Sequence, residues 1–271
     1  MPTLVSDGVR LHFEIRGSGL SLFLSHGVIE SSESWSEVAD CLSGRYRVVA
    51  HDARGRGRSG LSGRITYPAL AADVHAVAAH LGIRSFLHGG HSMGGRVALE
   101  HALAYPEEAL ALAVVAARAE APDQVGRRRL QLLAERVWRE GPAAAVEAWS
   151  KPGEPQHQRV VEISSRNSPE GTAAALEALA RMHSLLPRLP ELRRPTLIVA
   201  GDRDQAYVRS AELMRDAIPG AGLRVLPGVG HFPNLERPQA LAEELDAFFQ
   251  PLAAGLSATR PVAPPELDGG T

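Results

Sequence analysis

The chain has 271 residues, of which 44% are hydrophobic and 22% are charged, and these values are typical of a globular protein with a large buried core. Its net charge of −2 at pH 7 lacks the basic excess of a nucleic-acid-binding protein, and its single cysteine, Cys41, excludes an intramolecular disulfide. Because the sequence shows neither a secretory signal nor a run of about 18 apolar residues, we expect a cytoplasmic protein without a membrane span.

The first half of the chain alternates short apolar runs, which predict strands, with amphipathic runs, which predict helices. Strict alternation over Val9–Arg16 predicts an edge strand. Further strands are predicted at residues 20–25, 47–51, 85–88 and 109–116, and helices at residues 34–42, 69–81 and 97–104. Strands and helices in this order predict the α/β class, with a mostly parallel sheet and helices on both faces.

The middle of the chain departs from this alternation. Residues 120–188 are rich in Arg and Ala and show helical patterns without a buried-strand run. Pairs that contain proline divide this segment, at Gly141-Pro142, Pro152-Gly153 and Ser168-Pro169. We therefore predict a helical cap at residues 120–188, inserted between the two parts of an α/β core at residues 1–119 and 189–250.

The α/β alternation resumes after the predicted cap. Apolar runs at residues 195–201 and 223–226 predict strands, while residues 206–218 and 239–249 predict helices. Residues 251–271 are rich in proline near their end and offer little apolar surface to bury. We expect these residues to form a disordered tail.

A serine flanked by glycines stands between a predicted strand and a predicted helix. Residues 90–94 are Gly-His-Ser-Met-Gly, and they match the motif G-x-S-x-G. A tight strand-to-helix turn would lift the Ser92 hydroxyl clear of the sheet, and bulky side chains at Gly90 or Gly94 would clash in such a turn. The start of the helix also presents free N–H groups to a developing oxyanion. We therefore predict that Ser92 is a nucleophile.

A serine nucleophile needs a base, usually a histidine that a carboxylate holds in place. Among the 11 histidines, His231 lies in a loop between the last predicted strand and the last predicted helix, where open α/β folds place catalytic groups. Asp202 and Asp204 both follow the apolar run TLIVA. We favour Asp204, which lies further into the loop, and expect Asp202 to order the turn. The predicted triad is Ser92, Asp204 and His231.

The predicted oxyanion hole needs a second donor besides the backbone N–H of Met93. The Val28 backbone N–H is the candidate, because Val28 follows a predicted strand in the sequence SHGV, and His26 is expected to brace that loop. The sequence contains no H-E-x-x-H motif, no histidine pair at i,i+4 spacing and no cysteine pair, so we expect neither a metal nor a cofactor. The arginine-rich residues 54–58 lack interleaved aromatic residues and indicate a structured turn rather than a nucleic-acid site.

The chain resembles the α/β-hydrolase family along residues 4–250. Four motifs occur in the order of that family: His26-Gly27, DARGRGRS at residues 52–59, GHSMGG at residues 90–95, and Asp204 followed by His231. This resemblance implies the α/β-hydrolase fold with a helical cap and a Ser, Asp, His order of the triad. The family includes esterases, lactonases, thioesterases and lyases, while its dehalogenases and epoxide hydrolases use an aspartate where this chain has Ser92.

A narrower similarity is to the synthases of 2-succinyl-6-hydroxy-2,4-cyclohexadiene-1-carboxylate. The similar segments are SMGGR at residues 92–96, RNSPEG at residues 166–171 and GDRDQAY at residues 201–207. These enzymes eliminate pyruvate with the same triad and use arginines that hold substrate carboxylates. The similarity therefore implies substrate-binding roles for Arg96 and Arg166, with a further arginine among residues 127–129. His26 and Tyr207 complete the candidate substrate-binding residues.

Two reactions and one non-enzymatic role are compatible with these residues. The first is hydrolysis of a carboxylic ester, lactone or thioester of a small molecule through an acyl-enzyme on Ser92. The second is the carbon–oxygen lyase reaction of the similar synthases, in which Ser92 and His231 abstract a proton next to a carboxylate. The third is a ligand-sensing protein, which the complete triad disfavours. The expected partner is a small-molecule substrate rather than a nucleic acid or a membrane, and we expect a monomer or a homodimer.

Overall fold

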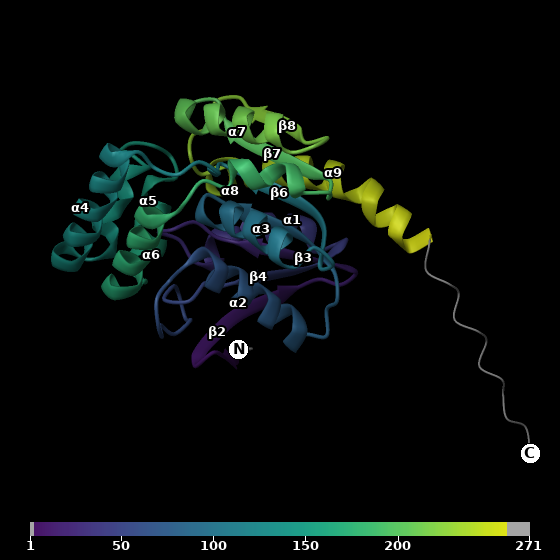
Figure 1. Cartoon of the computed structure of the whole chain (residues 1–271), viewed down its shortest axis with the longest axis horizontal. Helices are drawn as coiled ribbons and strands as arrows, with labels where there is room; N and C mark the ends of the chain where they lie inside the picture. Colours follow the sequence, from purple (N-terminus) through teal and green to yellow (C-terminus); the bar gives the residue numbers. More distant parts are fainter. Residues whose placement is uncertain (1–2, 259–271) are drawn as a thin grey trace, which may run out of the picture.

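The computed structural model describes residues 3–258, which form an eight-stranded sheet flanked by helices (Figure 1). The strands are β1 (Thr3–Ser6), β2 (Val9–Arg16), β3 (Leu20–Ser25), β4 (Tyr46–His51), β5 (Phe86–His91), β6 (Ala109–Val115), β7 (Thr196–Gly201) and β8 (Gly222–Leu226). Their order in the sheet is β1-β2-β4-β3-β5-β6-β7-β8. β2 pairs antiparallel with both β1 and β4, and all pairs from β4 to β8 are parallel. The predicted α/β class is therefore confirmed, and the parallel strands end at one common edge.

The helices fall into those of the core and those between β6 and β7. The core helices are α1 (Ser36–Leu42), α2 (Tyr67–His80), α3 (Met93–Ala104), α7 (Gln205–Ala217), α8 (Pro233–Glu236) and α9 (Pro238–Ala258), with the 3₁₀ helix η1 (Ser32–Trp35) before α1. Between β6 and β7 lie α4 (Gln124–Glu140), η2 (Pro142–Ala148), α5 (His157–Ser165), α6 (Pro169–Arg181) and η3 (Leu186–Glu191). Figure 1 shows α4, α5 and α6 grouped beside the sheet. Within residues 3–258, none of the helices combines the length and apolarity that crossing a bilayer requires.

Strand β3 shows how the alternation of side chains builds a core on each face of the sheet. Leu22 and Leu24 pack into the cluster that α1 and α9 cover, whereas Phe23 packs into the cluster under α2. All three side chains are fully buried. Burial of one such side chain contributes about 1.5–3 kcal/mol. Because β3 is apolar on both faces, it is stable only where both faces are covered. It accordingly lies in the middle of the sheet, next to β5.

Two predicted elements differ from the structure at the ends of the chain. Val9–Arg16, predicted as an edge strand, lies one place inside the edge because Thr3–Ser6 pairs along its outer side. The helix α9 continues past Pro251 to Ala258, where the sequence predicted the start of a disordered tail. Leu252 packs against the cluster that contains Phe249, and this contact supports the helix beyond the proline. The rest of the predicted tail, residues 259–271, lies outside the described residues.

The predicted cap is joined to the core by buried polar contacts near the start of α6. Arg56 donates a hydrogen bond of 2.6 Å to the Thr172 hydroxyl, and the Gly57 N–H donates to the Asn167 side chain at 2.7 Å. Gly171 passes so close to the core that a Cβ on it would lie 1.9 Å from the carbonyl oxygen of Gly55. Only glycine allows this approach, so the RNSPEG segment seats the cap on the core.

Candidate active site

The turn between β5 and α3 places Ser92 in a strained backbone conformation. Ser92 has φ 51° and ψ −112°, a region that costs a residue with a side chain about 1–3 kcal/mol. A Cβ on Gly90 would lie 2.2 Å from the Gly94 carbonyl oxygen, and a Cβ on Gly94 would lie 2.1 Å from the Ser25 carbonyl oxygen. The two glycines therefore permit the tight turn, as the G-x-S-x-G pattern indicates. Ser92 itself is only partly buried, so its hydroxyl can be reached.

Three strand-end loops bring the predicted triad residues into one hydrogen-bonded chain. The His231 Nε2 atom lies 3.2 Å from the Ser92 Oγ atom. The His231 Nδ1 atom lies 2.7 Å from Asp204 Oδ2. Asp202 is elsewhere, since its carboxylate accepts a hydrogen bond of 2.8 Å from the Gly228 N–H and orders the neighbouring turn. Of the two aspartates that the sequence offered, only Asp204 faces the imidazole.

The environment of His231 favours the neutral imidazole. Burial lowers the pKa of His231 below its ordinary value of 6.5, although the hydrogen bond that its ring donates to Asp204 acts in the opposite direction. At pH 7 the Nε2 atom is therefore unprotonated and available to accept the Ser92 proton. The Asp204 carboxylate requires Nδ1 to carry the hydrogen, which selects the tautomer that a general base needs.

The predicted oxyanion donors lie on two segments that touch each other. Met93 is the first residue of α3, and the first N–H groups of a helix have no acceptor within the helix. Val28 follows β3, whose last residue, Ser25, lies against Gly94 of the turn. His26 is buried, its Nδ1 atom bonds to the Gly27 carbonyl at 2.8 Å, and its Nε2 atom accepts from the Ala53 N–H at 3.0 Å. His26 thus braces the loop, as expected, but it is not among the residues that line the cavity.

The two arginines predicted to bind substrate carboxylates do not face the cavity described below. Arg96 is buried and donates hydrogen bonds to Glu100 and to the carbonyl oxygens of Ala119 and His183. Arg166 lies at the surface and pairs with Glu33 at 2.5 Å. Both guanidinium groups already have protein partners. The expectation that Arg96 and Arg166 bind substrate carboxylates is therefore not met in this structure.

A cavity of about 750 Å³ lies between the cap and the loops that carry the triad. His231, Asp204 and Tyr207 line it from the core, and the first turns of α4 together with Trp149 line it from the cap. Its apolar wall comes from Leu130, Leu132, Leu133, Trp149, Leu179 and Met182. Its basic residues are Arg118, Arg129, Arg136, Lys151 and Arg203. This composition suits a largely apolar small molecule, including one that carries a negative charge.

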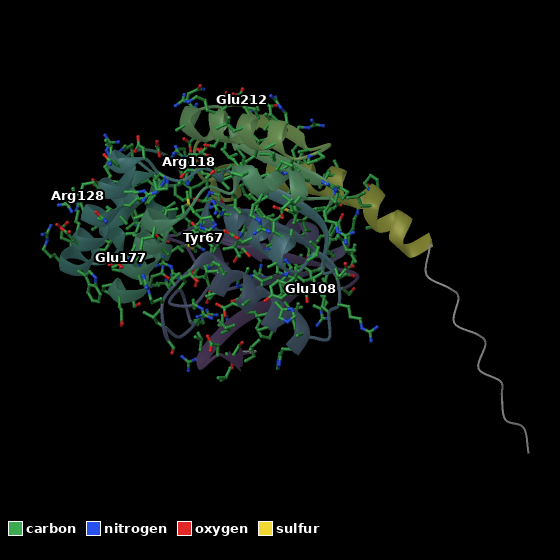
Figure 2. The ribbon with its side chains drawn as sticks, in the orientation of Figure 1. Tyr67, Glu108, Arg118, Arg128, Glu177 and Glu212 are labelled. Atoms are coloured by element: carbon green, nitrogen blue, oxygen red, sulfur yellow. The ribbon has the colours of Figure 1, made fainter. Side chains whose placement is uncertain are left out.

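Tyr207 is the predicted substrate-binding residue that does lie in this cavity. Its ring centre is 4.3 Å from that of His231. Burial raises the pKa of its hydroxyl, while the Arg118 charge and the Trp149 and Ser92 side chains act in the opposite direction. The Arg118 guanidinium covers the same ring at 4.6 Å. Figure 2 labels Arg118 where the core meets the cap helices. Trp149 and Arg118 were not predicted from the sequence, because neither belongs to a motif with recognisable spacing.

Comparison with known proteins assigns the family. The sequence profile described as "Alpha/beta hydrolase family" matches residues 22–244. The chain is 31% identical to a non-heme haloperoxidase of Rhodococcus erythropolis, over 83% of this chain and 90% of that protein. It is 27% identical to a 2-succinyl-6-hydroxy-2,4-cyclohexadiene-1-carboxylate synthase of Serratia proteamaculans, over 82% of this chain and 90% of that protein.

Among solved structures, a thermophilic esterase from Thermogutta terrifontis, studied with malate bound, superposes with a TM-score of 0.86 at 29% identity. The superposition covers 93% of this chain and 97% of the esterase. The predicted similarity to both the broad family and the synthases is thereby confirmed, and the relatives support a hydrolytic enzyme. On its sequence and on its fold, the chain belongs to the alpha/beta hydrolase family.

Proposed function

We propose that this protein is a serine hydrolase that cleaves a carboxylic ester, lactone or thioester of a small molecule. The observation that carries the proposal is the continuous hydrogen-bonded chain from Ser92 through His231 to Asp204, of which His231 and Asp204 line the cavity. His231 removes the proton of Ser92 as its oxygen attacks the substrate carbonyl. The N–H groups of Val28 and Met93 stabilise the oxyanion, and the leaving group departs with the proton from His231. Water, activated by the same imidazole, then releases the acid from the acyl-enzyme.

The experiment that tests this proposal combines labelling with turnover. A fluorophosphonate probe should label the protein at Ser92 and stop the hydrolysis of p-nitrophenyl esters. Ester chain length should be varied, because the apolar wall of the cavity favours an acyl or alcohol part that can cover it. An active protein that the probe does not label, or labels at another residue, would contradict the proposed nucleophile.

The alternative lyase reaction has less support from the site. Its physical argument rested on Arg96 and Arg166 as carboxylate ligands, and both are engaged by protein groups away from the cavity. Arg129, one of the three arginines at residues 127–129, does line the cavity, so this residue and the family similarity are what favour the lyase. Release of pyruvate from the 2-succinyl-cyclohexadiene precursor by the purified protein, at a rate well above ester hydrolysis, would favour the lyase over the hydrolase.

A further inference from the structure

A second carboxylate–imidazole pair lies beneath the triad, formed by Glu30 and His91. The His91 Nδ1 atom is 2.7 Å from Glu30 Oε2, and each side chain is only 1% exposed. His91 is the residue between Gly90 and the nucleophile, while Glu30 belongs to the loop after β3. The proposed mechanism uses neither residue. A fully buried ion pair is costly to desolvate and is rarely kept for stability alone.

The Glu30 carboxylate is surrounded by donors from separate loops. Its Oε2 atom also accepts from the Gly27 N–H at 2.5 Å, and its Oε1 atom accepts from the Asn234 amide at 3.0 Å. Burial alone would raise the pKa of Glu30, but the charge and hydrogen bond of His91, together with Asn234, lower it to about 2. Glu30 is therefore ionised. A Cβ on Gly27 would lie 2.4 Å from Glu30 Oε2, so a larger residue here would displace the carboxylate from this position.

The second nitrogen of His91 reaches the backbone of the predicted base. His91 Nε2 lies 2.7 Å from the His231 carbonyl oxygen. A carbonyl oxygen only accepts, so Nε2 must carry a hydrogen, and the ionised Glu30 requires a second one on Nδ1. Burial lowers the pKa of His91, but the Glu30 charge and both hydrogen bonds outweigh it and raise the pKa above its ordinary value. His91 is thus an imidazolium with both N–H groups used.

The His231 backbone is held from two opposite sides. Its carbonyl oxygen accepts from His91, as described above. The N–H groups of its two neighbours, Gly230 and Phe232, donate to the Glu236 carboxylate at 2.7 and 3.0 Å. The first contact ties the loop to the residue before the nucleophile, and the second ties it to α8. The position of the imidazole relative to Ser92 is therefore set by two carboxylates outside the triad.

We propose that Glu30 and His91 are positioning residues that hold the loops of the nucleophile, the oxyanion hole and the general base in register. The ion pair joins Gly27, next to the predicted donor Val28, with His91, next to Ser92, and with the His231 backbone. A shift of about 1 Å between such groups can lower a rate by about 10²-fold. The inference rests on the proposed serine hydrolase function.

The test uses three variants of the full chain: Glu30→Gln, His91→Gln and the double variant. Hydrolysis of one p-nitrophenyl ester is measured, and rates are divided by the fraction of sites that a fluorophosphonate titrates. We expect kcat to fall about 10–100-fold in each single variant, while KM changes less than about threefold. The double variant should lose about as much as one single variant, because the two residues belong to one hydrogen-bonded network and their effects are coupled. In the double variant neither side chain is charged, so no unpaired charge is buried. This variant can therefore still be measured if a single variant fails to fold.

The pH profile separates positioning by a charge from simple packing. The groups that face His231 are Asp204, His91, Glu30, Tyr207 and Glu236. Of these, the His91 cation lowers the pKa of His231, with its ring centre 5.1 Å away, and Glu30 raises it less strongly. His91→Gln removes the cation, so the pKa of His231 should rise and the acid limb of kcat/KM should move to higher pH. Loss of packing alone would leave the limb in place.

The matched control is the pair Arg54–Asp73, which is equally buried but belongs to a different part of the fold. Arg54 donates two hydrogen bonds of 2.7 Å to the Asp73 carboxylate. Asp73→Asn should lower the melting temperature and leave kcat per titrated site unchanged. If the double variant of Glu30 and His91 behaves like this control, the proposal is overturned. If the wild type neither hydrolyses esters nor reacts with the probe, it is the proposed function that fails.

Discussion

The strand-end loops of the core and the cap differ in how their side chains are held. In the loops, the imidazole of His231 and the carboxylate of Glu30 are buried and have fixed partners. In the cap, helix α4 leaves three large apolar side chains 46–60% exposed, namely Val125, Leu132 and Trp138. Contacts such as Asn167 with Gly57 join this layer to the core. The core therefore holds the side chains of the proposed triad in place, whereas the predicted cap contributes the wall of the cavity beside them.

This comparison has a kinetic consequence. Changes in the strand-end loops should lower kcat for every substrate, since they alter atoms that act only in the transition state. Changes in the cavity wall should alter discrimination between substrates.

Loss of the nucleophile should have the largest effect. Ser92→Ala removes the attacking oxygen and should lower kcat by about 10⁵-fold or more on all esters. The backbone strain at Ser92 is the same for alanine, so the melting temperature should stay near that of the wild type. Single-turnover hydrolysis and thermal melts measure both quantities. An alanine variant with substantial turnover would remove Ser92 from the mechanism.

The two aspartates of the loop after β7 offer a matched pair. Asp204→Asn disturbs the His231 tautomer and should lower kcat by about 10⁴-fold. Asp202→Asn keeps an oxygen that can accept from the Gly228 N–H, so it should retain most of the activity. Steady-state kinetics on a single ester compare the two. A larger loss at Asp202 would contradict the geometry of the site.

The residues of the strand-end loops could be predicted from the sequence better than the contacts made elsewhere. Ser92, Asp204 and His231 were predictable because a parallel sheet ends at one edge, so residues just after buried strands must meet there. Arg96 was misassigned because its position on the first turn of α3 does not show where the side chain turns. Its partner Glu100 lies one helical turn away, but its bond to the His183 carbonyl spans 87 residues of sequence.

The cap was predictable as a helical segment but not as a cavity wall. Trp149 follows a 3₁₀ helix, which is too short for a periodic pattern, and its place in the cavity depends on how the whole cap sits on the core. The Glu30–His91 pair was equally hidden, because it joins loops that are 61 residues apart. Functional residues at strand ends can thus be predicted from one sequence, whereas contacts between distant segments cannot.

The pH dependence should report the environment of the base. Burial lowers the pKa of His231 below 6.5, and the base must be neutral to act. The acid limb of kcat/KM should therefore lie below pH 6.5, with activity retained at mildly acidic pH. In Asp204→Asn the carboxylate that raises this pKa is gone, so the limb of the residual activity should move lower still. A limb at pH 7 or above in the wild type would contradict a buried, neutral imidazole.

The smallest expected effect concerns substrate charge and compares two arginines. Arg118 lines the cavity and covers Tyr207, whereas Arg166, in the cap, pairs with Glu33 outside it. If an anionic group of a substrate enters the cavity, Arg118 is a candidate partner for it, because its guanidinium lies over Tyr207, whose ring contacts that of His231. A charge-assisted hydrogen bond contributes about 1.5–3 kcal/mol, and the lower end applies here because the Arg118 side chain is 35% exposed.

Arg118→Ala should therefore lower kcat/KM for an anionic ester about tenfold relative to a neutral ester of the same size. Arg118→Lys should restore part of the difference, since it keeps the charge but not the planar group. Arg166→Ala is the control and should leave the ratio of the two esters unchanged. Removal of Arg118 also uncovers the Tyr207 ring, which should lower kcat/KM equally for both esters. The ratio of the two kcat/KM values is therefore unaffected by that loss. Equal losses on both esters in Arg118→Ala would mean that this arginine only supports the tyrosine, and that the basic residues of the cavity do not select for charge.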